Sequence, residues 1–181
     1  MTTPMGARAL AGAARLVTYP QAGYRADPDA LVTAAAGCDL EAAGLLAEFA
    51  GHLNDRSVDD LQELFTRTFD LNPQCALEVG WHLFGEEYER GAFLVRMREA
   101  LRAYAVPEAG ELPDHLASML QLVARLDAET AGLLVANALL PAVDKMLGPL
   151  EKAESPFLPL MKAIRRLLAA SAPAGAEVPH A

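Results

Sequence analysis

Cysteine is scarce in this chain of 181 residues: Cys38 and Cys75 are the only two, and they form no CxxC motif. A chain this long with so few cysteines is not a disulfide scaffold. The first residues place Arg8 and Arg15 among alanines, without the continuous apolar run of a signal peptide. No uncharged run approaches the roughly 20 residues that cross a bilayer. We therefore predict a cytoplasmic protein without stable membrane insertion.

Positive charge is also in short supply, with 15 Lys and Arg against 24 Asp and Glu and a net charge of −9. This lack of a basic surface argues against a nucleic-acid partner. The imbalance is local, because residues 39–114 hold 16 acidic and 6 basic side chains and also the single tryptophan, Trp81. An amphipathic ring in a negative region suits a basic, partly apolar polypeptide as partner.

Motifs of catalysis and cofactor binding are missing: there is no P-loop, dinucleotide fingerprint, HExxH, EF-hand or GxSxG sequence. The four histidines, at 52, 82, 115 and 180, are scattered and have no thiolate nearby. Glu86, Glu87 and Glu89 suit the solvated first turn of a helix better than an acid/base pair. The sequence thus predicts no enzyme, no metal site and no cofactor.

What the chain does have is helical periodicity almost throughout. Apolar residues at 61, 64, 65 and 69 follow the i, i+3, i+4, i+8 pattern, and Ser57 stands before them as an N-cap with Asp60 three residues on. Residues 129–147 are apolar nearly all round, which predicts a central helix that Pro141 kinks or displaces. The fold class is therefore all-α: one globular bundle of about eight or nine helices.

Breaker residues set the domain organisation. We predict one helical domain over residues 1–171 and a disordered tail over residues 172–181, which is rich in alanine and proline. The segment 106–113 has prolines near both ends and a glycine between them, so it is a candidate hinge loop. Asn72-Pro73 is expected to open a helix, and Gly85 to close it.

Trp81-His82-Leu83-Phe84 lies near the end of that helix. Core packing is the favoured interpretation for Leu83 and Phe84. Trp81 and His82 each keep a polar edge that needs water or a partner, so a binding role is equally open for them.

A second group, Glu111-Leu112-Pro113-Asp114-His115, stands where the loop meets the next helix. One interpretation is a helix start, in which Pro113 fixes the entry and Asp114 favours the positive end of the helix. The other is a binding site, in which His115 donates or accepts a hydrogen bond because it titrates near neutrality. The two interpretations are compatible.

These residues carry a resemblance. The runs Thr68-Phe69-Asp70, Trp81-His82-Leu83-Phe84-Gly85-Glu86 and Arg90-Gly91 are similar to the nitrate reductase molybdenum-cofactor assembly chaperones (the NarJ or delta-subunit type), within the wider TorD-like family. That family's second signature is a glutamate, a proline and an Asp-His pair, which Glu111, Pro113, Asp114 and His115 match. Leu16-Val17-Thr18-Tyr19-Pro20 resembles the end of the family's first helix. One departure is Gly80-Trp81, where the family commonly has a tyrosine.

The resemblance, over roughly residues 8–170, implies an all-helical cytoplasmic chaperone for a molybdopterin oxidoreductase. Such a chaperone binds the N-terminal segment of the catalytic subunit and supports insertion of the molybdenum cofactor before membrane docking or export. Trp81, His82 and Phe84 are then expected to supply apolar and ring contacts. Asp70, Glu78, Glu111 and Asp114 are expected to face basic residues of the guest, with Pro113 and His115 completing the site.

Two other functions remain open. A general helical adaptor would bind an amphipathic partner helix without any role in cofactor loading. A nucleotide-dependent protein is the other, because guanine nucleotides have been linked to the Asp-His region of this family, although no phosphate cradle or basic cluster stands near Asp114. For the oligomeric state we expect a monomer or a weak homodimer, since related chaperones exchange helices between protomers.

Overall fold

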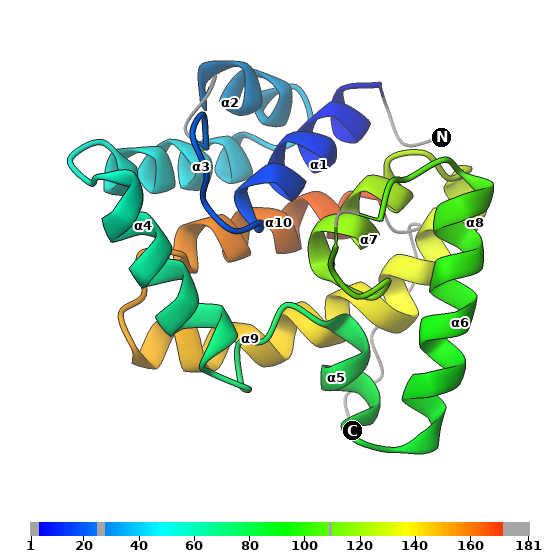
Figure 1. Cartoon of the computed structure of the whole chain (residues 1–181). Coiled ribbons are helices and arrows are strands. Elements are labelled where there is room, and N and C mark those ends of the chain that lie inside the picture. Colours follow the sequence, from blue (N-terminus) through cyan, green and yellow to red (C-terminus); the bar gives the residue numbers. More distant parts are fainter. Residues whose placement is uncertain (1–3, 25–27, 109, 172–181) are drawn as a thin grey trace.

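Helices make up the regular structure of the computed structural model, which describes residues 4–24, 28–108 and 110–171 (Figure 1). Over these residues the chain forms nine continuous helices and no β-strand, which confirms the all-α prediction. The predicted tail, 172–181, lies outside the described residues. The helical segments are α1 Pro4–Leu16, α2 Pro28–Ala36, α3 Leu40–Leu53, α4 Val58–Phe65 running into the π-turn η1 Thr66–Asp70, α5 Val79–Phe84, α6 Tyr88–Ala103, α7 Leu116–Val123, α8 Ala128–Leu134, the π-turn η2 Val135–Leu139, α9 Leu140–Lys152 and α10 Leu158–Ala169.

The start of α4 is a capping box, as the sequence predicts. The Asp60 backbone N–H donates to Ser57 Oγ at 3.1 Å, and the Ser57 backbone N–H donates to Asp60 Oδ2 at 2.9 Å. These hydrogen bonds satisfy donors that have no partner inside the helix. They also hold the pKa of Asp60 below its usual value, chiefly through the bond from the Ser57 hydroxyl.

The end of α5 is predicted correctly and its start is not. Gly85 ends the helix with φ of 59°, a backbone conformation that favours glycine. Asn72-Pro73 does not open it: the Cys75 N–H donates to Asn72 C=O at 2.9 Å, and the chain turns back before Val79 begins the helix. An asparagine that bonds its own local backbone stabilises a turn as readily as a helix start.

The longest helix, Ala128–Lys152, shows the predicted effect of Pro141. Proline has no N–H, so the carbonyl of Asn137 cannot accept the usual i+4 hydrogen bond, and the π-turn η2 lies just before Pro141. By length and composition this helix could cross a membrane, with 44% of its most apolar stretch buried inside the bundle. A core helix of a water-soluble protein passes the same test.

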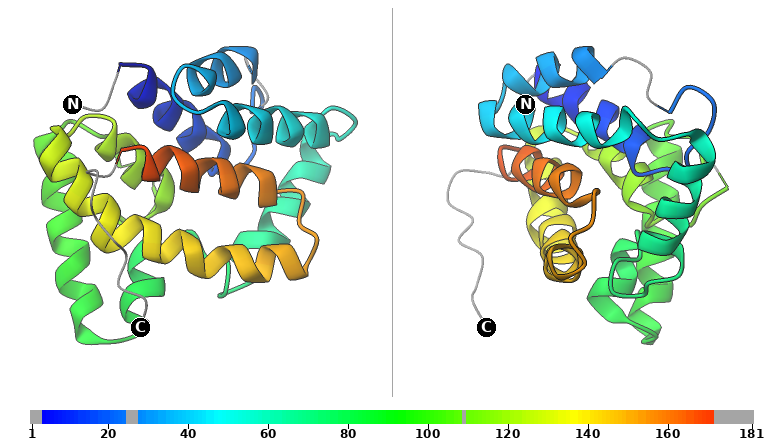
Figure 2. Two further views of the ribbon diagram at one scale, coloured as in Figure 1. Left: turned by 180° about the vertical axis from the view of Figure 1, so that it is seen from behind. Right: turned by 90° about the vertical axis from the view of Figure 1, so that its left-hand side faces the viewer.

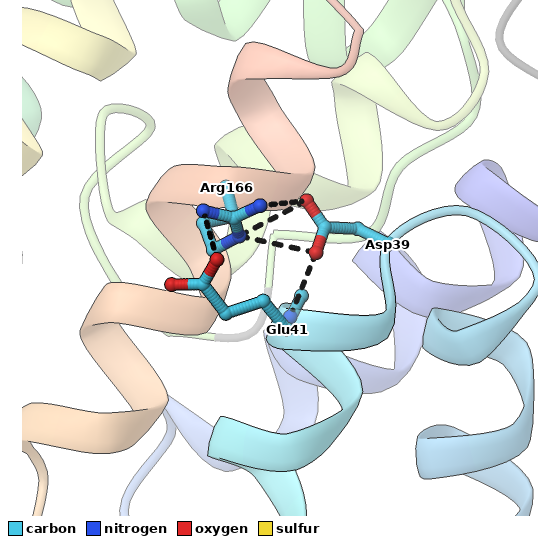
Figure 3. A network of polar contacts seen from close by, with 4 residues as sticks. Asp39, Glu41 and Arg166 are labelled. Atoms are coloured by element: carbon cyan, nitrogen blue, oxygen red, sulfur yellow. Dashed lines mark hydrogen bonds and ion pairs between the residues drawn. The ribbon is translucent and has the colours of Figure 1, made fainter.

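Helix α10 lies between α3 and α9, with α1 packed on α2, α7 and α10 (Figure 2). Its inner face buries Leu160, Ile164 and Leu167. Its last turn is joined to the start of α3 by Arg166 (Figure 3). The Arg166 Nη2 atom lies 2.8 Å from Asp39 Oδ2, and Nη1 lies 2.8 Å from Glu41 Oε2. Because Asp39 also accepts the Ala42 N–H at 2.9 Å, it caps α3 and binds α10 at once.

The loop between α6 and α7 returns the chain to α5. Its first residues are fixed by Arg125, which donates to the carbonyls of Tyr104 (at 3.1 Å) and Ala105. Further along, Glu108 forms ion pairs with Arg98 at 3.3 Å and Arg102 at 3.6 Å. The described part of the predicted hinge segment 106–113 has no helix. Its role as a hinge stays a prediction.

Candidate functional site: an acidic pocket

Two segments far apart in the sequence, residues 77–79 and 114–116, lie side by side. The Val79 N–H donates to Asp114 C=O with an N–O distance of 2.9 Å, and the Leu116 N–H donates to Leu77 C=O at 2.8 Å. This isolated antiparallel bridge sets Glu78 opposite His115. The two regions that the sequence singles out are therefore joined through their backbones.

A pocket of about 370 Å³ opens beside this bridge. We call it the acidic pocket, because three carboxylates line it together with three aromatic rings. Its lining consists of Asp70, Glu78, Glu111, Tyr19, Phe65, Phe69, Ala76, Leu77 and His115. A volume of this size is typical of sites that hold a single small ligand or one long side chain.

The aromatic wall of the pocket is the edge of the core. The ring centroids of Phe65 and Phe69 lie 5.0 Å apart, and Tyr19 meets Phe65 edge-on at 5.9 Å. Phe69 in turn packs against the fully buried Phe157 at 4.8 Å. The π-turn η1 sets the orientation of Phe69 and Asp70, since π-turns add a residue to one turn and shift the faces that follow.

The charge of the pocket is not neutralised by the protein itself. Asp70 and Glu111 are exposed and Glu78 is half-buried. Within the described chain, none of the three has a basic side chain within ion-pair distance. Three carboxylates around one opening repel each other and attract a cation, and the low dielectric of the aromatic wall strengthens both effects.

Asp114 lies behind the pocket and is not part of its lining. Its side chain is fully buried, and Oδ2 accepts the backbone N–H of Gly80 at 2.9 Å. The Arg90 Nε atom is 3.9 Å from the same oxygen, and Oδ1 has no hydrogen-bond partner among the described residues. Burial raises the pKa of Asp114, against the Gly80 hydrogen bond and the Arg90 charge, which lower it. Of the interpretations left open for Asp114, the N-cap does not hold, because His115 caps α7 and the Asp114 carboxylate accepts from α5.

Gly80 stands where a side chain would meet the buried carboxylate of Asp114. A Cβ atom at this position would lie 2.7 Å from Asp114 Oδ2 and 3.0 Å from Phe93 Cδ1. The absent side chain thus lets the carboxylate reach the backbone of α5.

The cap of α7 is His115. Its Nδ1 accepts the Ala117 N–H at 3.3 Å, so the neutral ring carries its proton on Nε2. Burial lowers the pKa of His115, while the carboxylates of Glu111, Glu78, Asp114 and Asp70 act in the opposite direction. The buried histidine therefore offers the pocket a neutral ring edge.

Trp81 and His82 are half-buried, and both hold the irregular segment that precedes α5. Trp81 Nε1 donates to Pro73 C=O at 2.9 Å, and the Arg90 guanidinium carbon lies 5.7 Å from the centroid of the Trp81 ring. The His82 Nε2 atom is 2.7 Å from Ala76 C=O. Burial lowers the pKa of His82 as well. Neither side chain lines the acidic pocket.

Of the nine residues expected to bind a guest, the structure brings Asp70, Glu78, Glu111 and His115 together around the pocket. The other five do not line it: Phe84 is half-buried against Phe93, with ring centroids 5.6 Å apart, and Pro113 is buried in the loop before α7. Sequence reasoning did not assign the rings of Tyr19, Phe65 and Phe69 to the site. A signal was present for two of them, because Tyr19 and Phe69 stand inside the family-like runs.

Among the residues that the structure describes, no three His, Cys, Asp or Glu side chains are arranged to hold a metal ion. The acidic pocket combines three carboxylates with an aromatic wall, a lining that attracts cations.

The fold and the pocket define a class: an all-α protein with an acidic, ring-lined recess. Comparison with protein families is more specific, since the family model described as nitrate reductase delta subunit matches residues 35–163. The chain belongs to this family. It is a family of chaperones that act in nitrate reductase maturation, not of catalysts. A search of curated proteins found no match.

Proposed function

We propose that this protein binds the basic N-terminal segment of a molybdopterin oxidoreductase catalytic subunit in the acidic pocket. It holds the immature subunit while the molybdenum cofactor is inserted, before membrane docking or export. The observation that carries the proposal is the set of three unpaired carboxylates, Asp70, Glu78 and Glu111, around a recess with an aromatic wall. Membership of the nitrate reductase delta subunit family supports a nitrate reductase catalytic subunit as the partner.

The pocket suits an arginine side chain of the guest. A guanidinium group is planar, forms paired hydrogen bonds to carboxylates and stacks on aromatic faces. Glu78 and Glu111 supply the carboxylates, and the rings of Tyr19 and Phe69 supply the faces. A lysine would gain the charge attraction but not the planar fit.

The remaining predicted residues support the pocket or extend it. Asp114 joins the segment that holds His115 to α5 through the Gly80 N–H, and Pro113 is buried just before it. His82 holds Ala76, which lines the pocket. Trp81 and Phe84, both half-buried on α5, extend the site with apolar area for the next residues of the guest.

The release of the guest segment depends on the same energetic terms as its binding. A guest segment that is disordered before binding loses conformational entropy when it is ordered, so its net affinity is moderate. Long-range attraction to the acidic region speeds encounter, and added salt slows it. A chaperone that hands over its client needs fast binding and ready release.

The test is peptide binding, measured by fluorescence anisotropy with a labelled peptide of the catalytic subunit's N-terminal segment. We expect Glu78→Gln/Glu111→Gln to weaken binding by about 2 kcal/mol, roughly thirtyfold, because two charge-assisted contacts are lost. The matched control is Glu89→Gln/Glu129→Gln, which removes the same charge from exposed positions outside the pocket. Equal weakening by both pairs would show that only net charge matters and would refute the pocket.

A second measurement separates cofactor loading from simple adaptor binding. Nitrate reductase is purified from cells that carry either the wild-type chain or Glu78→Gln/Glu111→Gln, and its molybdenum content is determined. We expect less molybdenum per enzyme with the pocket variant. Full molybdenum content together with lost peptide binding would favour the general adaptor.

A further inference from the structure

A second cavity lies between α1, α2 and α3, and its charged lining residues are basic where those of the acidic pocket are acidic. Its volume is about 580 Å³, within the range of small-molecule sites. It runs along α1 from Arg8 to Leu16 and along α3 from Leu46 to Asn54, about 12 Å in each case at 1.5 Å per residue. It shares no lining residue with the acidic pocket.

The inner surface of this cavity is apolar. Leu46, Phe49 and Leu53 of α3 form a buried floor, and Leu31 of α2 is half-buried beside them. Tyr24 presents its ring, since its hydroxyl donates to Leu16 C=O at 2.5 Å. Water in such a space has few hydrogen-bond partners, so an apolar ligand displaces it at little cost.

Small residues of α1 and α2 leave the cavity open. Ala11, Gly12, Ala30 and Ala34 line it where larger side chains would fill it. A Cβ atom on Gly12 would lie 2.7 Å from Leu31 Cδ1, so the glycine lets the leucine lie against α1. The cavity therefore exists because α1 and α2 carry small residues at these positions.

The rim of the cavity is basic. Arg8 and Arg15 line it, both are exposed, and their spacing of seven residues puts them on one face of α1, about 10 Å apart. In the part of the chain that the structure describes, the lining includes no acidic side chain. Neither arginine forms an ion pair within the described chain, unlike Arg98, Arg165 and Arg166. Two unpaired guanidinium groups beside an apolar space complement a ligand with an anionic head and an apolar body.

We propose that this cavity is a binding site for a small amphiphilic carboxylate: its hydrocarbon body lies over Phe49 and Leu46, and its head group binds Arg8 and Arg15. The site is independent of the acidic pocket and takes ligands of the opposite charge. A chaperone of this design carries one receptor for a basic peptide and another for an anionic amphiphile.

Displacement of the fluorescent apolar sulfonate ANS by decanoate tests the proposal, with decyltrimethylammonium as the chain-matched cation. Decanoate is expected to displace ANS from the wild-type protein, and the cation to do so at least about tenfold more weakly. Arg8→Gln/Arg15→Gln should weaken decanoate binding about tenfold or more, while Arg96→Gln, an exposed arginine outside the cavity, leaves it unchanged.

A second variant tests whether the hydrocarbon part of the ligand lies inside the cavity. Ala11→Trp puts an indole at an exposed position of the lining and should abolish decanoate binding with circular dichroism unchanged. Peptide affinity should be the same in all these variants, which keeps this result separate from the acidic pocket. Equal binding of decanoate and the cation, undiminished decanoate binding by the double variant, or no displacement of ANS would each overturn the proposal.

Discussion

Carboxylates at two places in this bundle have opposite surroundings. At the start of α3, Asp39 and Glu41 both pair with Arg166 of α10 (Figure 3). The hydrogen bond from Arg166 holds the pKa of Asp39 below its usual value. Around the acidic pocket, the carboxylates of Glu78 and Glu111 have no such partner among the described residues. One group of charges joins two helices, and the other lines the acidic pocket.

The comparison teaches that the negative charge of this chain serves two purposes that its total cannot separate. A carboxylate that caps a helix and binds an arginine contributes to stability. Like charges gathered at an opening lower stability slightly through repulsion and increase the attraction of a cation. Variants of the first group should change unfolding without changing peptide binding, and variants of the second group should do the reverse.

The largest effect on stability is expected at Gly80, where the segments beside the pocket contact the core. Gly80→Ala would force Asp114 and Phe93 away from the new Cβ atom, at a cost of about 1–3 kcal/mol in the free energy of unfolding. The Glu78–His115 bridge should loosen with it, so peptide affinity should also fall. Urea unfolding and anisotropy measure the two effects. Gly91→Ala is the control: this exposed residue of α6 has open space, and alanine there should stabilise the helix.

A smaller effect is expected at the helix junction. Asp39→Ala removes the cap of α3 and the partner of Arg166, and should lower the free energy of unfolding by about 1 kcal/mol. Arg166→Gln keeps the cap and should destabilise less. Both variants should bind the peptide as the wild type does. A loss of peptide affinity in either, with the fold intact at the assay temperature, would break the division into stabilising and binding carboxylates.

The smallest effect is expected in the pH dependence of the free energy of unfolding. Burial lowers the pKa of His115 below 6.5, so the unfolded chain binds more protons than the folded one once the pH falls below that value. Stability from this residue is therefore complete above about pH 6.5 and is lost on acidification. His115→Asn keeps a capping oxygen and removes the titration. Urea unfolding at about pH 7.5 and pH 5 should show a greater loss for the wild type than for this variant. Equal losses would contradict a depressed pKa.

Local chemistry let much of the fold be predicted from the sequence. Ser57 with Asp60, Gly85 and Pro141 each act through their own backbone neighbours, so a one-dimensional pattern is enough to place a cap, a helix end and a displaced turn. Asn72-Pro73 led to a wrong helix start, because its hydrogen bonds fit a turn as well as the start of a helix. The π-turn η1 left no signal in the pattern, and its Phe69 packs on Phe157, which lies far along the chain.

The candidate site was only partly visible in the sequence. The acidic residues could be predicted because charge is counted directly along the chain. The position of Asp114 could not, since its burial depends on a glycine 34 residues earlier. Tyr19, which follows α1, meets Phe65 of α4 across a long sequence separation, and no local pattern shows that both rings line the pocket.

The backbone bridge between Glu78 and His115 has a consequence for synthesis in the cell. Residues from Tyr19 to His115 must meet before the pocket exists, so a nascent chain on the ribosome has the charges but not the receptor. On the proposed function, the ability to hold a client appears together with the finished tertiary structure. Half-made copies would then not compete for the client, because only folded molecules carry the pocket.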